Sequence, residues 1–238
     1  MPDYRDLTDQ LTGLLGLSAA PLAIAFHDTV PDGVARIRGA FPPATEDGRT
    51  GAVAAGCVFW NDGQHATFAT EPEDHANCSV GSLTHGLITL EEAASRADVQ
   101  AVCEANWVQP EIFPSIPTVG SRPAAIVYGP LAECAGEPDV VLLRLVGRQV
   151  MQLHSAVPSL RFEGKPQCHI VAIAKEQQEV AVSVGCMLSR VRTGMSNNEV
   201  TCAIPGSRLG EVVASLKETC EADRLVASYA SEDAKRFA

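Results

Sequence analysis

The stretch from Glu179 to Pro205 contains the sharpest change of pattern in the chain, and it most constrains how the chain can fold. Three valines between Val180 and Val184 alternate with small residues, which predicts a short strand. Gly185 then permits a tight turn, after which apolar residues recur at helical spacing. This pattern predicts Cys186 at a helix N-terminus, where backbone N–H groups and the helix dipole favour a thiolate. A small cysteine packed in a buried turn is the alternative.

The remaining patterns predict a mixed α/β fold, with helices and strands in irregular alternation. The predicted helices are Asp3–Leu17, Gly51–Trp60, Thr89–Cys103, Gly147–Ala156, Pro166–Lys175 and one that begins after Ser207. The predicted strands are Pro21–Phe26, Val34–Arg38, His65–Thr70, Pro123–Tyr128, Asp139–Leu145, Glu179–Val184 and Val200–Ile204. Thr89 and Glu92 have the spacing of a capping box. Residues 41–50 and 106–120 are rich in loop-forming residues and predict a polar loop and a linker.

Cysteines recur at nearly constant spacing, which indicates an internal duplication. Cys57 and Cys168 are 111 residues apart, and Cys78 and Cys186 are 108 residues apart. We therefore expect a single domain over residues 1–238, built of half-repeats at about 18–110 and 120–225 that a Pro-rich linker joins. Pseudo-twofold packing of the halves would bring these four cysteines together.

Four converging thiolates are the ligand set of an iron–sulfur cluster or a structural zinc. Buried thiolates repel one another and lose hydration, so a cation is expected between them. The small-residue helices around Cys57 and Cys168 favour a [4Fe–4S] cluster over the tight turns that usually hold zinc. Buried structural or redox-active thiols are the remaining alternative. The other cysteines, Cys103, Cys134, Cys202 and Cys220, are predicted to pack in the core.

Several stretches resemble the uncharacterised ArCR family, domain of unknown function 169. They are PLAIAFHDTVPDG, EDHANCSVG with Cys78, and SVGCMLSR followed through RTG by NNEVTCAIP. The resemblance extends from about Leu14 to Ile204, and its most specific element is the Gly185-Cys186 pair with Arg190. It implies that Cys57, Cys78, Cys168 and Cys186 form a shared set, and it implies no particular reaction.

Charged and titratable residues near the cysteines are candidates for catalysis. His75 and His85 flank Cys78 and could donate protons or supply a fourth ligand. Arg190 and Arg192 could bind an anionic substrate, because a guanidinium presents a planar fork of donors. Glu199, Glu73 and Asp74 could act as general bases. Each candidate has a structural alternative, which is a surface histidine, a solvated arginine or a capping acid.

The charge balance limits the classes of partner. A net charge of −11 and a pI near 4.9 argue against nucleic acid, which needs clustered Lys and Arg. No apolar run is long enough to span a bilayer, and the first residues lack the pattern of a secretion signal. Eight cysteines without such a signal indicate reduced thiols or metal ligation, so a cytoplasmic protein is expected. The sequence leaves homodimerisation open.

The cysteine set favours an iron–sulfur enzyme of small-molecule metabolism, with a substrate that is anionic if the arginines bind it. An open iron suits Lewis-acid lyase or desulfuration chemistry, whereas a fully ligated cluster suits a reductase with an electron-donor protein. One alternative is a non-catalytic module that binds a ligand and holds a structural zinc. Another is a thiol redox enzyme that uses Cys78 and Cys186.

Overall fold

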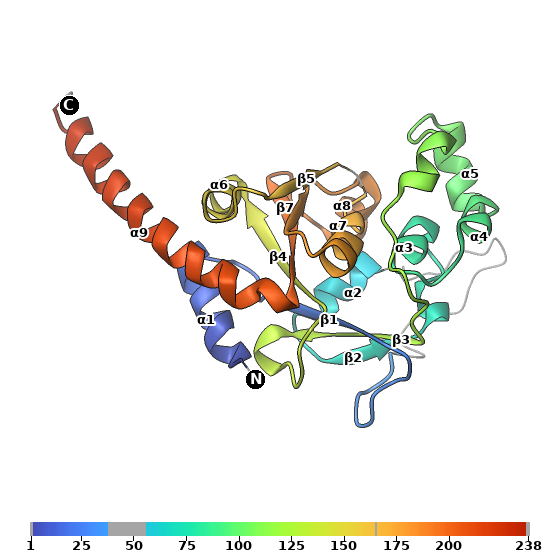
Figure 1. The fold of residues 1–238 in the computed structure, drawn as a ribbon. Coiled ribbons are helices and arrows are strands. Elements are labelled where there is room, and N and C mark those ends of the chain that lie inside the picture. Colours follow the sequence, from blue (N-terminus) through green and yellow to red (C-terminus); the bar gives the residue numbers. More distant parts are fainter. Residues whose placement is uncertain (1, 38–55, 165, 237–238) are drawn as a thin grey trace.

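The computed structural model describes residues 2–37, 56–164 and 166–236, which form one mixed seven-stranded sheet with helices on both faces (Figure 1). The strand order is β2-β3-β1-β4-β7-β6-β5. The strands are β1 Leu22–His27, β2 Phe68–Thr70, β3 Ala125–Pro130, β4 Val140–Val146, β5 Arg161–Glu163, β6 Ala181–Ser183 and β7 Glu199–Pro205. Only the β5–β6 pair is parallel among these strands. The predicted mixed α/β fold class is confirmed.

Helices of three kinds connect these strands. The α-helices are α1 Tyr4–Leu15, α2 Gly56–Asp62, α3 Ser79–Thr84, α4 Leu90–Ala94, α5 Ala97–Glu104, α6 Gly147–Ala156, α7 His169–Ala172, α8 Met187–Thr193 and α9 Leu209–Ala234. The 3₁₀ helices are η1 Pro72–His75, η2 Pro110–Ser115, η3 Leu131–Glu133 and η5 Gly206–Arg208, and η4 Ile173–Gln177 is a π-helix. None of the helices in the described ranges is long and apolar enough to cross a membrane.

Local sequence signals explain where several helices begin and end. The Asp3 side chain accepts hydrogen bonds from the Arg5 and Asp6 backbone N–H groups, which caps the start of α1. Gly16 ends α1 with φ +66°, a conformation that glycine adopts without strain. The predicted capping box of Thr89 and Glu92 is confirmed at the start of α4.

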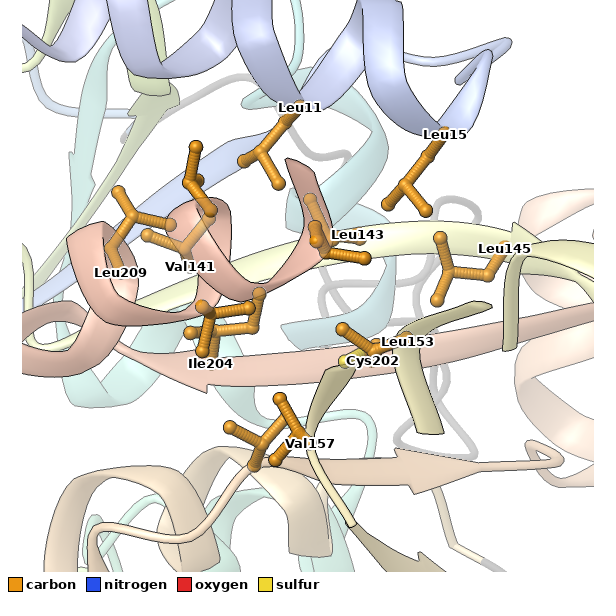
Figure 2. Packing of buried hydrophobic residues seen from close by; sticks show 14 of the residues in the cluster. Leu11, Leu15, Val141, Leu143, Leu145, Leu153, Val157, Cys202, Ile204 and Leu209 are labelled. Carbon is orange, nitrogen blue, oxygen red and sulfur yellow. The ribbon is translucent and has the colours of Figure 1, made fainter. Parts of the chain in front are cut away.

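Side chains along β4 alternate between two hydrophobic cores, because successive residues of a strand point to opposite faces. Val141, Leu143 and Leu145 belong to the core that α1, α6 and α9 cover. Figure 2 shows these side chains packed below Leu11 and Leu15 of α1. Val140 and Leu142 instead join the core under α2 and α7. The face covered by α2 and α7 is the one that bears the cysteines considered below.

The two sides of the sheet, taken outward from the central strands β1 and β4, have a similar order of strands and helices. On one side β1 is followed by β3 and β2, and on the other β4 is followed by β7 and β6. α2 precedes β2 and α3 follows it, as α7 precedes β6 and α8 follows it. This arrangement is compatible with the predicted duplication, which stays a prediction. In this arrangement β3 lies on the same side of the sheet as β1 and β2. If the duplication is real, the boundary between the half-repeats would therefore fall after β3 and not within residues 106–120.

Some predicted elements differ from the observed ones. Of the predicted strand at 34–38, the described residues form only an isolated bridge between Arg36 and Ala69. The helix predicted to run through Cys103 is two helices, α4 and α5, which Ser95 and Arg96 separate. Residues 106–120 include the helix η2 and are not a plain linker. The predicted loop at 41–50 and the first part of the predicted helix at 51–60 lie outside the described residues.

Candidate functional site

The four cysteines singled out in the sequence line one narrow cavity of about 20 Å³ on the α2–α7 side of the sheet. Cys57 lies in the first turn of α2, while Cys78, Cys168 and Cys186 are the N-cap residues of α3, α7 and α8. Cys168 and Cys186 are buried, and Cys57 and Cys78 are partly buried. The structure thus brings the four together from four separate elements, and their role as ligands stays a prediction.

Cys186 occupies the strand-to-helix junction that the sequence predicts. Gly185 has φ +81°, which supplies the turn between β6 and α8. The Cys186 thiol lies 3.3 Å from the Ser189 backbone nitrogen, which donates to it. The Ser189 hydroxyl in turn lies 3.2 Å from the Cys186 backbone N–H and accepts from it. The N-terminal turn of α8 therefore fixes the sulfur and directs a backbone donor at it.

Two glycines leave room beside the cavity. A Cβ atom at Gly81 would lie 3.4 Å from the Cys78 sulfur, so the first turn of α3 packs directly against that thiol. A Cβ atom at Gly56 would lie only 3.1 Å from Cε1 of His85. Side chains at these two positions would press on the sulfur and on the imidazole. No pattern in the sequence marked Gly56 or Gly81, because their role depends on contacts between separate helices.

The thiols lie in an environment that disfavours their charged form. Burial and, to a smaller extent, the neighbouring Cys78 thiol together raise the pKa of Cys57 to about 12. Burial also raises the pKa of Cys78 and, more strongly, that of Cys168. Without a compensating cation these three cysteines are therefore neutral thiols near pH 7. A bound cation would reverse this balance and stabilise thiolates.

Arg192 is the cationic side chain among the described residues that line the cavity. Its Nη2 donates to the backbone oxygen of Asn77 at 3.2 Å. Its Nη1 is buried and has no hydrogen-bond partner in the described parts of the chain. The guanidinium lowers the pKa of Cys57 and Cys78, against the larger effect of burial. Arg192 thus places a buried, unsatisfied donor beside the sulfurs.

His85 also lines the cavity and is fully buried. Its Nδ1 lies 2.7 Å from the backbone oxygen of Gly81, which requires Nδ1 to carry the proton and to donate it. Its Nε2 therefore has a free lone pair, and it has no partner among the described residues. Burial lowers the pKa of His85 to about 4, so the imidazole is neutral near pH 7. A histidine whose first ring nitrogen binds a backbone carbonyl can offer the second to a metal or a ligand.

His75 lies behind His85, outside the lining of the cavity. Its Nε2 is 2.9 Å from the Thr70 hydroxyl, and its ring packs edge-on against Phe59 with centroids 4.9 Å apart. Burial and the nearby His85 hold its pKa well below the usual value. Of the two histidines predicted as proton donors or ligands, only His85 faces the cysteines.

Arg190 and Glu199, the other predicted catalytic residues, are held in contacts within the fold. Arg190 donates to the backbone oxygens of Ser196 at 2.6 Å and Glu199 at 2.9 Å, and also to that of Val184. The Glu199 carboxylate accepts from Arg144 at 2.9 Å. Neither side chain lines the cysteine cavity. The structure assigns both to the join between α8 and β7.

A larger pocket of about 260 Å³ adjoins the cysteine cavity and shares Cys78 and Cys186 with it. The segment from α5 to η2 forms its far wall. This segment overlaps residues 106–120, which were predicted from the sequence to be a linker. The three prolines and the weak periodicity of that stretch gave no sign that it forms the wall of a pocket.

The described residues contain no three His, Cys, Asp or Glu side chains close enough to hold one metal ion. The four cysteines line one cavity, but no three of them form such a group. A single tetrahedral ion, with sulfur bonds of about 2.3 Å, needs its ligands much closer together. In a cluster each thiolate binds a different iron, so the sulfurs lie further apart.

Comparison with known proteins identifies the family of this chain but gives no information on its activity. No curated protein and no solved structure matches this chain. The family model described as uncharacterised ArCR, domain of unknown function 169, matches residues 10–215, which include all four cysteines, His85 and Arg192. The chain therefore belongs to the uncharacterised ArCR family.

Proposed function

We propose that this protein binds an iron–sulfur cluster, of the [4Fe–4S] type, through Cys57, Cys78, Cys168 and Cys186. The observation that carries the proposal is the single cavity that all four cysteines line, although they come from four different elements. Its fit to a cluster rests on the donor set, since Cys thiolates are the usual ligands of such clusters. We further propose a cytoplasmic location, where free thiols persist.

The unsatisfied groups around the cavity support an anionic occupant that contains metal. Four thiolates give a cluster a net negative charge, and the buried Nη1 of Arg192 would donate to it. The Nε2 lone pair of His85 faces the same space and could accept a proton from a bound substrate or replace one cysteine as a ligand.

The number of essential cysteines separates the two classes of chemistry. A cluster held by all four cysteines would supply electron transfer, which suits a reductase served by an electron-donor protein. A cluster held by three would leave one iron open to a small-molecule substrate as a Lewis acid. In either case the protein's own residues position the substrate, and His85 is the described cavity residue best placed to exchange a proton with it.

Anaerobic purification with iron, sulfide and zinc analysis tests the proposal. We expect about four irons and four sulfides per chain and a broad absorbance near 400 nm. Serine substitution of Cys57, Cys78, Cys168 or Cys186, one at a time, should abolish or strongly weaken the absorbance. The matched control is Cys103→Ser, because Cys103 lies outside the cavity lining. A folded, colourless and iron-free anaerobic preparation would refute the proposal, and stoichiometric zinc in it would support the zinc module.

A further inference from the structure

The pocket beside the cysteines has the size and lining of a small-molecule site. Its volume of about 260 Å³ is close to the lower end of the range of ligand pockets in proteins. Apolar side chains dominate its wall, chiefly Val102, Trp107, Ile112, Phe113, Ile116 and Leu188. Two of them, Ile112 and Leu188, are 43% and 39% exposed, which is unfavourable apolar exposure that a ligand would remove.

The polar groups of the pocket favour an uncharged ligand. No Lys or Arg occurs among the described residues of its lining, so it offers no counterion to an anion. The Asp98 carboxylate is already used, because it accepts from the Ser79 backbone N–H at 2.9 Å and from the Ser79 hydroxyl at 2.6 Å. The Asp98 carboxylate also repels an anion, so the lining favours an uncharged ligand over an anionic one. Of the two predicted anion binders, Arg190 is engaged elsewhere, and Arg192 lines the cysteine cavity and not this pocket.

One buried polar group in the lining lacks a partner. His169 is 7% exposed, and its Nε2 makes no hydrogen bond within the described ranges. It follows Cys168 directly and is among the residues that line the pocket. A buried imidazole nitrogen without a partner is costly, and a ligand N–H or O–H group would satisfy it.

We infer that this pocket binds an uncharged, mainly apolar small molecule that carries one hydrogen-bonding group for His169. Bound there, the molecule would touch Cys78 and Cys186, which line both spaces. Its assignment as the substrate rests on the proposed function, whereas its binding does not. The anionic substrate expected from the arginines stays a separate prediction for the cysteine cavity.

Binding of N-phenyl-1-naphthylamine to the full-length protein tests the inference. This dye is uncharged and aromatic, carries one N–H group and fluoresces more strongly in apolar surroundings. We expect saturable binding of one dye per chain. Val102→Phe fills part of the pocket and should weaken binding roughly tenfold or more. Ile112→Asp, at the exposed rim, should weaken it too, and Val226→Phe, on the exposed part of α9, should not.

A second pair of measurements tests His169. The dye should bind several-fold tighter than 1-benzylnaphthalene, which has the same shape with CH₂ in place of N–H, measured by displacement of the dye. His169→Phe should remove that difference. Absence of dye binding, or binding unaffected by both Val102→Phe and Ile112→Asp, overturns the inference.

Iron content is measured on the same samples, so that the pocket and the iron–sulfur cluster are tested independently of each other. Dye binding that Val102→Phe weakens in iron-free protein keeps the pocket and refutes the cluster. A normal cluster in protein that binds no dye refutes the pocket and keeps the cluster.

Discussion

Glu199→Gln distinguishes a structural role for this residue from the catalytic role that its sequence position suggested. The Oε2 atom of Glu199 accepts from the Ser196 backbone N–H at 2.7 Å, from the Ser196 hydroxyl at 2.9 Å and from Arg144 at 2.9 Å. Its side chain is 17% exposed. Glutamine keeps the shape and one acceptor oxygen but removes the charge.

The expected loss follows from the difference between charged and neutral hydrogen bonds. A bond to a charged group contributes about 1.5–3 kcal/mol, against about 0.5–1.5 kcal/mol for a neutral one. Three bonds share one oxygen, and the site is partly solvated, so the differences do not add fully. We expect Glu199→Gln to lower the free energy of unfolding by about 2 kcal/mol at pH 7. Iron content and cluster absorbance should stay those of the wild type.

The effect should depend on pH in a defined direction. Burial raises the pKa of Glu199, but its hydrogen bonds to Ser196 and its pairing with Arg144 outweigh burial and lower it overall. A carboxylate with a lowered pKa stabilises the folded state above the unfolded pKa, about 4.3 for glutamate, and loses this contribution as the pH falls through the folded value. The stability difference between wild type and Glu199→Gln should therefore be full at pH 7 and shrink below about pH 4.3.

Urea unfolding followed by circular dichroism measures the difference at each pH. The control is Glu218→Gln on the exposed side of α9, which should change stability by less than about 0.5 kcal/mol. Unchanged stability of Glu199→Gln, together with loss of iron or of turnover, would refute the structural role and restore the catalytic one.

Two further substitutions test the packing around the site and the sheet. Gly63→Ala, at the end of α2, would place a Cβ atom 2.6 Å from Leu22 Cδ1 and 2.9 Å from Tyr128 Cβ, and should lower the unfolding free energy by about 1–3 kcal/mol in urea titrations. The same change at Gly13 in α1, where no atom lies within 4 Å, should instead raise it by about 0.5–1 kcal/mol, and equal effects at the two positions would contradict this account. Leu143→Ala, at a side chain 1% exposed, should cost about 3 kcal/mol, whereas Val226→Ala at 65% exposure should cost under about 0.5 kcal/mol, and a similar small loss in both would argue against the packing in Figure 2.

Elements with a strong local signal could be predicted from the sequence. The helix at Gly147–Ala156 has the predicted bounds, and Cys186 is the N-cap residue that the strand-to-helix switch indicates. Gly185 and the period of the apolar residues suffice there, because neither depends on distant parts of the chain. The same holds for the capping box at Thr89.

Features that depend on distant contacts could not be predicted. The antiparallel pairing of β1 with β3 joins residues about a hundred positions apart, and the sequence patterns do not state which strands pair. Arg190 and Arg192 are two residues apart on α8, yet one binds backbone oxygens and the other lines the cysteine cavity. The two side chains leave the helix in different directions, one toward β7 and the other toward the start of α3. The sequence cannot show this difference, because it depends on where β7 and α3 lie in the folded protein.

Arg192 is the described residue that bears most directly on the choice between packed neutral thiols and the proposed anionic occupant. Four protonated cysteines can pack in an interior without cost, as small apolar side chains do. In that arrangement the buried Nη1 of Arg192 would remain a donor without a partner in the described chain, a penalty of about 1–3 kcal/mol. Thiolates around a metal centre remove the penalty, because they return a net negative charge to the space that Arg192 faces. The unsatisfied donor of Arg192 therefore supports the proposed anionic centre over four neutral thiols.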